Sequence, residues 1–193
     1  LTAPTILDQY APCSLLCPGC GGGAGEEEKE PGDKAQVVIV NVTDPSASVV
    51  LKSGYATVFK LKEKKEDGSL REVQRTILME GAAPDGSTAV YTPLDESELP
   101  APFGEGVTFM PYGFNLAITD PEGTPVAEVT GMMVLRFFLP EGFKLPLGMR
   151  LVIQYYDPET SSWIPVSTGV GGGMAYAYVK KTGTYALTMM PNP

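Results

Sequence analysis

Three cysteines, Cys13, Cys17 and Cys20, lie close together near the start of the 193-residue chain. Thiolates are soft metal ligands and redox-active nucleophiles, so this C-x3-C-x2-C spacing can serve a metal site, a disulfide or a bond to another chain. A single internal disulfide uses two of the three thiols and leaves one over. Cysteine chemistry is therefore the first functional question that the sequence raises.

The cysteine spacing is similar to that of the radical S-adenosylmethionine enzymes, in which three thiolates hold an iron–sulfur cluster. That family places the motif in an α/β barrel, whereas no alternation of strand and helix patterns follows Cys20. A zinc site would need a fourth ligand from a carboxylate or from a partner. We therefore expect no metal and no cofactor. We expect a disulfide or inter-subunit cross-link among Cys13, Cys17 and Cys20, with a lipid or another modification left open for the remaining thiol.

The chain contains no histidine, which removes the commonest general base and the commonest metal ligand. Ser-His-Asp and Cys-His nucleophilic arrangements are thereby excluded. The acidic residues cluster in Glu26–Glu30, in Asp95–Glu98 and in turns, where a solvated surface is their ordinary role. We therefore predict no catalytic residues and no enzyme activity.

The stretch from Val126 to Thr188 consists of β-branched and aromatic runs that Gly, Pro, Asp and Ser interrupt at short intervals. Such runs predict consecutive antiparallel strands. In the segment 150–156, Leu151, Ile153 and Tyr155 fall on one face, which suits a sheet that packs on one side. The pattern predicts an all-β protein.

The same stretch contains LVIQYYD from Leu151, WIPV from Trp163 and GTYAL from Gly183. This order of elements resembles the last strands of immunoglobulin-like β-sandwich modules in bacterial cell-surface and secreted proteins. The resemblance covers about the C-terminal third and implies an extracellular structural or adhesive role. The cysteine pair and tryptophan spacing of antibody domains is absent. The fold expected is an immunoglobulin-like antiparallel β-sandwich with extra strands and an extended N-terminal arm.

Composition divides the chain into three parts. Residues 1–20 form an extended arm that carries the cysteines, residues 21–34 a flexible linker rich in Gly and Glu, and residues 35–193 the β body. The body holds ten or eleven predicted strands, either in one sandwich or in two small subdomains that meet near residues 94–105. The apolar segment 35–42 is expected to lie centrally in its sheet.

Two local signals refine this prediction. Pro111 and Gly113 interrupt a long strand and indicate a bend, a bulge or an edge position. Residues 94–99 can form one helical turn, and the glycines at 171–173 read as a hairpin loop.

A net charge of −9 argues against nucleic acid as a partner. No run is long enough for a transmembrane helix. Because the chain starts at Leu1 rather than Met, we expect that a signal peptide has been removed. The expected location is extracellular or at the cell surface.

Two further features can each be interpreted either structurally or functionally. The sequon at Asn41 can accept an N-linked glycan, although it sits in a predicted strand. Six aromatic residues near the C-terminus can stack on sugars, but we expect them in the sandwich core. They are Tyr155, Tyr156, Trp163, Tyr176, Tyr178 and Tyr185.

The main functional hypothesis is a secreted structural subunit of an extracellular filament, sheath or surface layer. Its N-terminal arm would add a strand to an exposed sheet edge of another copy, as in donor-strand complementation. The partners expected are thus copies of the same chain. One alternative is a carbohydrate-binding or adhesion module for cell-surface glycans, and another is an accessory subunit of a membrane-associated complex.

Overall fold

The computed structural model describes residues 36–42 and 45–192, which belong to a compact unit spanning residues 34–193. Its elements are twelve β-strands and one 3-10 helix. They are β1 (Gln36–Val42), β2 (Ala47–Val50), β3 (Tyr55–Lys64), β4 (Leu70–Leu78), β5 (Thr88–Leu94), η2 (Glu96–Glu98), β6 (Thr108–Thr119), β7 (Glu128–Phe138), β8 (Met149–Asp157), β9 (Ser162–Pro165), β10 (Gly169–Gly171), β11 (Met174–Lys181) and β12 (Gly183–Pro191).

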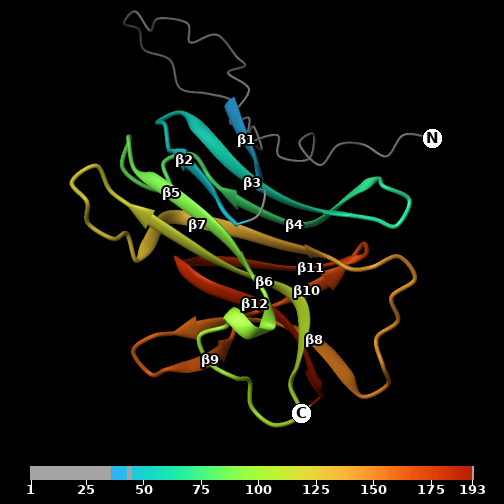
Figure 1. The fold of residues 1–193 in the computed structure, drawn as a ribbon. Coiled ribbons are helices and arrows are strands. Elements are labelled where there is room, and N and C mark those ends of the chain that lie inside the picture. The colour runs from blue at the N-terminus through green and yellow to red at the C-terminus, as the bar shows by residue number, and fades with distance from the viewer. Residues whose placement is uncertain (1–35, 43–44, 193) are drawn as a thin grey trace, which may run out of the picture. The chain divides into compact units, whose positions relative to one another are not determined.

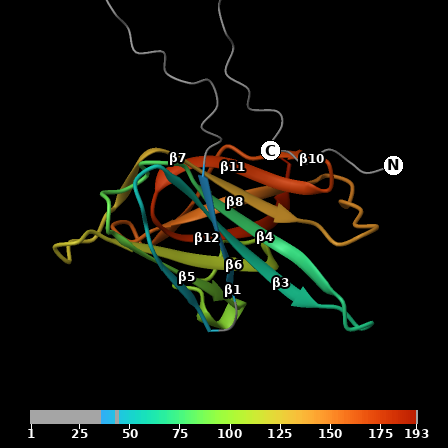
Figure 2. The same ribbon diagram turned by 90° about the horizontal axis from the view of Figure 1, so that it is seen from above.

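The strands form two six-stranded sheets (Figure 1). Sheet A has the order β1-β3-β4-β7-β11-β10, and sheet B has the order β2-β5-β6-β12-β8-β9. The predicted all-β sandwich is confirmed, while the immunoglobulin-like relationship stays a prediction. Seen from above, the β3–β4 hairpin extends well beyond the neighbouring strands (Figure 2).

The alternation predicted for the C-terminal strands is present. Leu151 and Ile153 of β8 are buried in the core between the sheets, and so are Ala175 and Ala177 of β11. Their neighbours along each strand point to the outer faces, because successive side chains of a strand alternate between its two sides.

A row of stacked aromatic rings runs through this core. Tyr91 lies between Phe59 and Phe114, with ring centroids 5.3 and 4.8 Å away, and Tyr185 lies 5.6 Å from Phe114. These rings come from both sheets, from β3 on one side and from β5, β6 and β12 on the other. Large aromatic side chains thus supply much of the apolar surface that holds the two sheets together.

The prediction that residues 35–42 lie centrally in a sheet is wrong. β1 is an edge strand, and it pairs in parallel with β3 alone. Its apolar character arises because both of its faces contact apolar neighbours. Val38 and Val40 share the inner face with Phe59, whereas Val37 and Ile39 lie on the outer face, beside Ala56 and Val58 of β3.

The interruption at Pro111 and Gly113 is a bulge in β6, as predicted. Gly113 is opposite Ala186 of β12, whereas the next pair joins Phe109 to Thr188, so β6 has two more residues than β12 in this stretch. The predicted helical turn is the 3-10 helix η2, where the backbone N–H of Asp95 donates to the Glu98 carboxylate at 2.9 Å.

The strand β10 was not expected, because Gly-Val-Gly has little strand propensity. It pairs with β11, and the ring of Tyr176 lies over Gly169. A Cβ atom built on Gly169 would lie 2.3 Å from the Tyr176 ring carbon Cζ. A side chain at position 169 would therefore require the Tyr176 ring to move, and the strand forms through packing rather than propensity.

Candidate functional site

In the part of the body that the structure describes, neither a cluster of metal ligands nor a roomy pocket provides a candidate site. Across residues 36–42 and 45–192, no group of His, Cys, Asp and Glu side chains could hold a metal ion. A depression beside Leu51, Tyr55 and Leu78 is large enough for about one water molecule. No helix in this part of the chain is long and apolar enough to cross a membrane. The candidate site is therefore a surface rather than a pocket.

One of the predicted site residues lies in the described part of the chain, and three lie outside it. Cys13, Cys17 and Cys20 lie outside the described residues, as does the whole N-terminal arm. Asn41 lies in β1, where it is exposed, while Thr43 of its sequon falls in a gap between the described ranges. Of the four predicted residues, Asn41 therefore is the one that the structure describes, and it lies on an edge strand of sheet A.

The two sheets have four edge strands, and three of them are short. β10 has three residues with two glycines, β9 has four residues and ends in Pro165, and β2 has four residues. β1 has seven residues, of which none is charged and none is proline. Natural edge strands are usually shortened, charged or bulged, which prevents the pairing of another strand. β1 has none of these protections and is the edge best suited to accept one.

The outer face of sheet A carries an apolar row next to this edge. The cross-strand registers place one residue from each of five neighbouring strands side by side. We call Ile39, Val58, Ile77, Val134 and Tyr178 the apolar row. Its two ends are about half exposed, at 54% for Ile39 and 50% for Tyr178. Between these ends Val58 and Val134 are buried and Ile77 is partly buried, so the row is exposed at β1 and β11 and covered in the middle.

The next row along the strands is basic. Lys60 of β3 pairs with Arg75 of β4, and Arg75 pairs with Arg136 of β7. We call these three residues the basic row. Asn41 of β1 continues the row at one end, and Tyr176 of β11 continues it at the other. The basic row therefore begins next to the uncharged edge strand.

Within the described residues, Arg75 is the one cation of the basic row that forms an ion pair. Arg75 binds the Glu72 carboxylate through Nε at 2.6 Å and Nη2 at 3.0 Å, and its guanidinium lies 5.6 Å from the centroid of the Phe138 ring. Among the described residues, Lys60 and Arg136 have no ion-pair partner. The basic row thus keeps a positive charge on a chain whose net charge is −9.

The outer face of sheet B is different, because the loop between β5 and β6 packs against it. Phe103 of this loop contacts Trp163 of β9 at 4.6 Å and Phe109 of β6 at 6.1 Å between ring centroids. The Trp163 indole N–H donates to the carbonyl of Ala101 at 2.9 Å. Part of this face is therefore already covered by the chain itself.

The expectation that all six C-terminal aromatic residues lie in the core holds only in part. Tyr185 belongs to the core, and Tyr155 packs against it. Tyr156, Trp163, Tyr176 and Tyr178 are only partly buried, and they lie on the outer faces of the sheets. The rings of Tyr176 and Tyr178 meet at 82° and those of Tyr156 and Trp163 at 64°, so neither pair forms a flat platform for a sugar ring.

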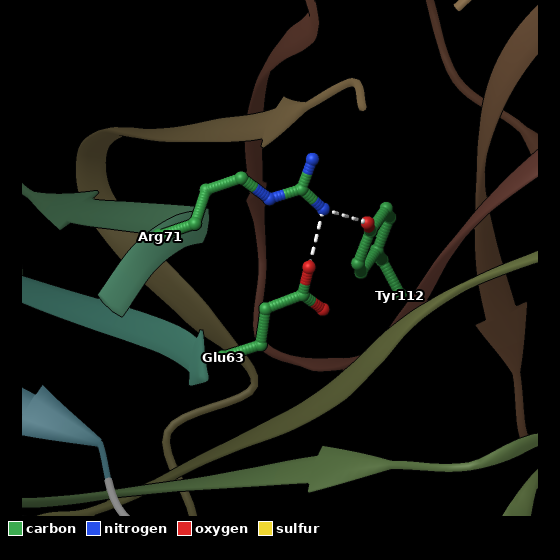
Figure 3. A network of polar contacts seen from close by, with 3 residues as sticks. All are labelled: Glu63, Arg71 and Tyr112. Carbon is green, nitrogen blue, oxygen red and sulfur yellow. Dashed lines mark hydrogen bonds and ion pairs between the residues drawn. The ribbon is translucent and has the colours of Figure 1, made fainter. Parts of the chain in front are cut away.

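A polar network that the sequence did not predict joins the two sheets near the β3–β4 hairpin (Figure 3). The Arg71 guanidinium donates both to the Glu63 carboxylate and, at 2.8 Å, to the hydroxyl of Tyr112 on β6. Burial, together with the nearby Glu63 charge, raises the pKa of Tyr112, although Arg71 opposes this effect. Since all three residues are engaged with one another, we interpret this network as a structural clamp.

No protein-family model matches the chain, and no curated protein matches it.

Proposed function

We propose that the protein is a structural subunit of an extracellular filament, sheath or surface layer. Copies would join when the N-terminal arm of one copy pairs with β1 of the next. The observation that carries this proposal is the character of β1, a seven-residue edge strand without charge, proline or bulge. An edge of this kind presents unpaired backbone N–H and C=O groups to another strand.

The sequence before the body suits this mode of assembly. The arm begins with ten moderately apolar residues, LTAPTILDQY, which include one charged side chain and one proline. The linker at residues 21–34 is rich in glycine and glutamate, and a flexible chain of this length has an average end-to-end distance of about 20 Å. An arm on such a linker can reach an adjacent subunit.

The cysteines extend the proposal to covalent cross-linking. Cys13, Cys17 and Cys20 lie in the second half of the arm, so disulfides between subunits would secure the contact in an oxidising environment. An extracellular or cell-surface location is part of the same proposal. The glycan-binding and accessory-subunit alternatives stay predictions without a specific observation in their favour.

Removal of residues 1–20 tests the arm. We expect this variant to fold, with an unchanged thermal transition of the body, and to remain monomeric when examined by electron microscopy and sedimentation. Filaments or sheets formed as readily as by the complete chain would rule the arm out.

A substitution in the edge strand tests the acceptor. Ile39→Lys places a charge on β1 at an exposed position, and we expect it to block addition of a strand while the body stays folded. Leu147→Lys is the matched control, because Leu147 is fully exposed in the loop between β7 and β8. Equal assembly of the two variants would exclude β1 as the acceptor.

A further inference from the structure

We propose that the basic row on the outer face of sheet A binds the acidic segment Glu26–Glu30 of a second copy. This inference rests on the proposed function, because it assumes that the arm and linker of one copy reach the sheet of another. It adds a second contact to the strand pairing at β1, one made by charged side chains rather than by the backbone.

The first argument is the arrangement of like charges. Lys60, Arg75 and Arg136 occupy directly opposed positions on three adjacent strands. Like charges at opposed positions of a sheet repel one another and destabilise the fold. Glu72 offsets only the charge of Arg75. An arrangement that costs stability in the isolated body is explained when an anionic partner neutralises it.

The second argument is the charge of the chain itself. Residues 26–30 read Glu-Glu-Glu-Lys-Glu, which places four carboxylates within five residues. The basic row could offer three cations to this segment. Two of them, Lys60 and Arg136, lack an ion-pair partner within the described residues. Carboxylates form charge-assisted hydrogen bonds with both ammonium and guanidinium groups, and Arg can bind them through two nitrogens.

The third argument is geometric. Neighbouring strands lie about 4.8 Å apart, so the basic row, which spans β3, β4 and β7, covers about 10 Å. An extended chain rises about 3.3 Å per residue, and Glu26–Glu30 therefore covers about 13 Å. The two lengths match when the acidic segment crosses the strands along the row.

The order of the parts along the chain agrees with this path. The row is continued by Asn41 on β1, the strand proposed to pair with the arm. The acidic segment lies a few residues after the arm in sequence. An arm that pairs with the outside of β1 thus brings the acidic segment of the same donor close to the start of the basic row.

Charge reversal in the complete chain tests the contact. The body variant combines Lys60→Glu with Arg136→Glu, and the segment variant combines Glu27→Lys with Glu28→Lys. We expect each to raise the critical concentration for assembly about tenfold, because exposed ion pairs are replaced by repulsion. A chain that carries all four substitutions should regain at least half of the assembly that either two-substitution variant loses. Equal effects of the single-sided and four-substitution variants would overturn the inference.

The matched control changes the same net charge elsewhere. Lys65→Glu with Lys144→Glu alters two exposed lysines that lie in loops away from the basic row. We expect this control to assemble like the unmodified chain. An equal loss of assembly in the control would show that net charge alone acts, and it would overturn the inference.

Zero-length cross-linking identifies the copy that supplies the acidic segment. A carbodiimide joins lysine amines to carboxylates, so Lys60 should link to Glu26–Glu30 in assembled material. When isotopically heavy and light chains are mixed, linked peptides with one heavy and one light partner support the inference. Links between Lys60 and this segment only within one copy, or none at all, overturn it.

The two proposals fail in different ways. If deletion of residues 1–20 abolishes assembly and charge reversal has no effect, the arm acts as proposed and the basic row does not. If the deletion leaves assembly unchanged, the proposed function fails, whatever the charge variants do.

Discussion

Arg75 and Arg136 lie directly opposite one another on the neighbouring strands β4 and β7, with their side chains on the outer face of sheet A. Of the two, Arg75 alone has a carboxylate partner among the residues that the structure describes, namely Glu72. The pair therefore combines an unfavourable electrostatic contact with a clear potential to bind an anion.

Replacement of Arg136 should stabilise the isolated body. Arg136→Thr removes the repulsion with Arg75 and places a residue of high strand propensity on β7, so we expect a gain of about 0.2–1 kcal/mol. Thermal unfolding of the non-assembling chain that lacks residues 1–20 measures this as a rise of about 1–3 °C. Arg75→Thr is the control, because it leaves Glu72 without its partner and should give no such gain. A lower transition temperature for Arg136→Thr would contradict the prediction.

A glycan on Asn41 should oppose assembly. Asn41 is exposed on β1 and lies next to Lys60 in the cross-strand register, so an N-linked glycan would stand at the start of the basic row. We expect material from a glycosylating host to assemble poorly until the glycan is removed enzymatically. Asn41→Gln from the same host should assemble without this treatment. If glycosylated and deglycosylated chains assemble alike, Asn41 does not border the contact.

The tyrosines predict loss of stability at alkaline pH. Burial is the largest cause that raises the pKa of Tyr185, Tyr91 and Tyr112 above the usual value near 10. Above pH 10 the unfolded chain loses these phenolic protons and the folded chain keeps them, so the free energy of unfolding should fall as pH rises.

Tyr112→Phe separates one contribution to this effect. The substitution removes the titrating group, so we expect the free energy of unfolding to decline less steeply between pH 10 and 12 than it does in the unmodified chain. At pH 7 it should cost about 1 kcal/mol, because the hydrogen bond from Arg71 is lost. Denaturant titrations at several pH values measure both effects, and identical slopes for the two chains would contradict the prediction.

Two glycines in β10 should respond differently to the same substitution. Gly169→Ala places a Cβ atom where the Tyr176 ring lies, so the ring must move, and we expect a cost of about 1–3 kcal/mol. Gly171→Ala meets no atom within 4 Å and should be nearly neutral. Urea unfolding compares the variants. Equal stability of the two variants would show that the Tyr176 ring moves aside without a cost in free energy.

The fold class was predictable because strand formers and turn residues alternate so regularly. The alternation in β8, the bulge at Pro111 and Gly113 in β6 and the turn η2 were all apparent from local sequence. Each of these features depends on residues that are close together along the chain. Propensity and turn chemistry act over the same short range.

The candidate surface could not be predicted in the same way. Lys60, Arg75 and Arg136 become neighbours only through the registers of two strand pairs, and a shift of one residue would move each side chain to the opposite face. The placement of β1 at an edge was missed for a related reason. Its apolar pattern suits a central strand, and at an edge the pattern is explained by the apolar neighbours Ala56 and Val58 on the outer face of β3.

The parallel pairing of β1 with β3 determines how the body would respond to a pulling force. The chain passes through β2 of the other sheet between these two strands, so no hairpin turn joins them. Tension that enters at Gln36 and acts along β1 would load the hydrogen bonds to β3 together, instead of opening them one after another. In an assembly of linked subunits, β1 would thus give each body a high resistance to mechanical unfolding.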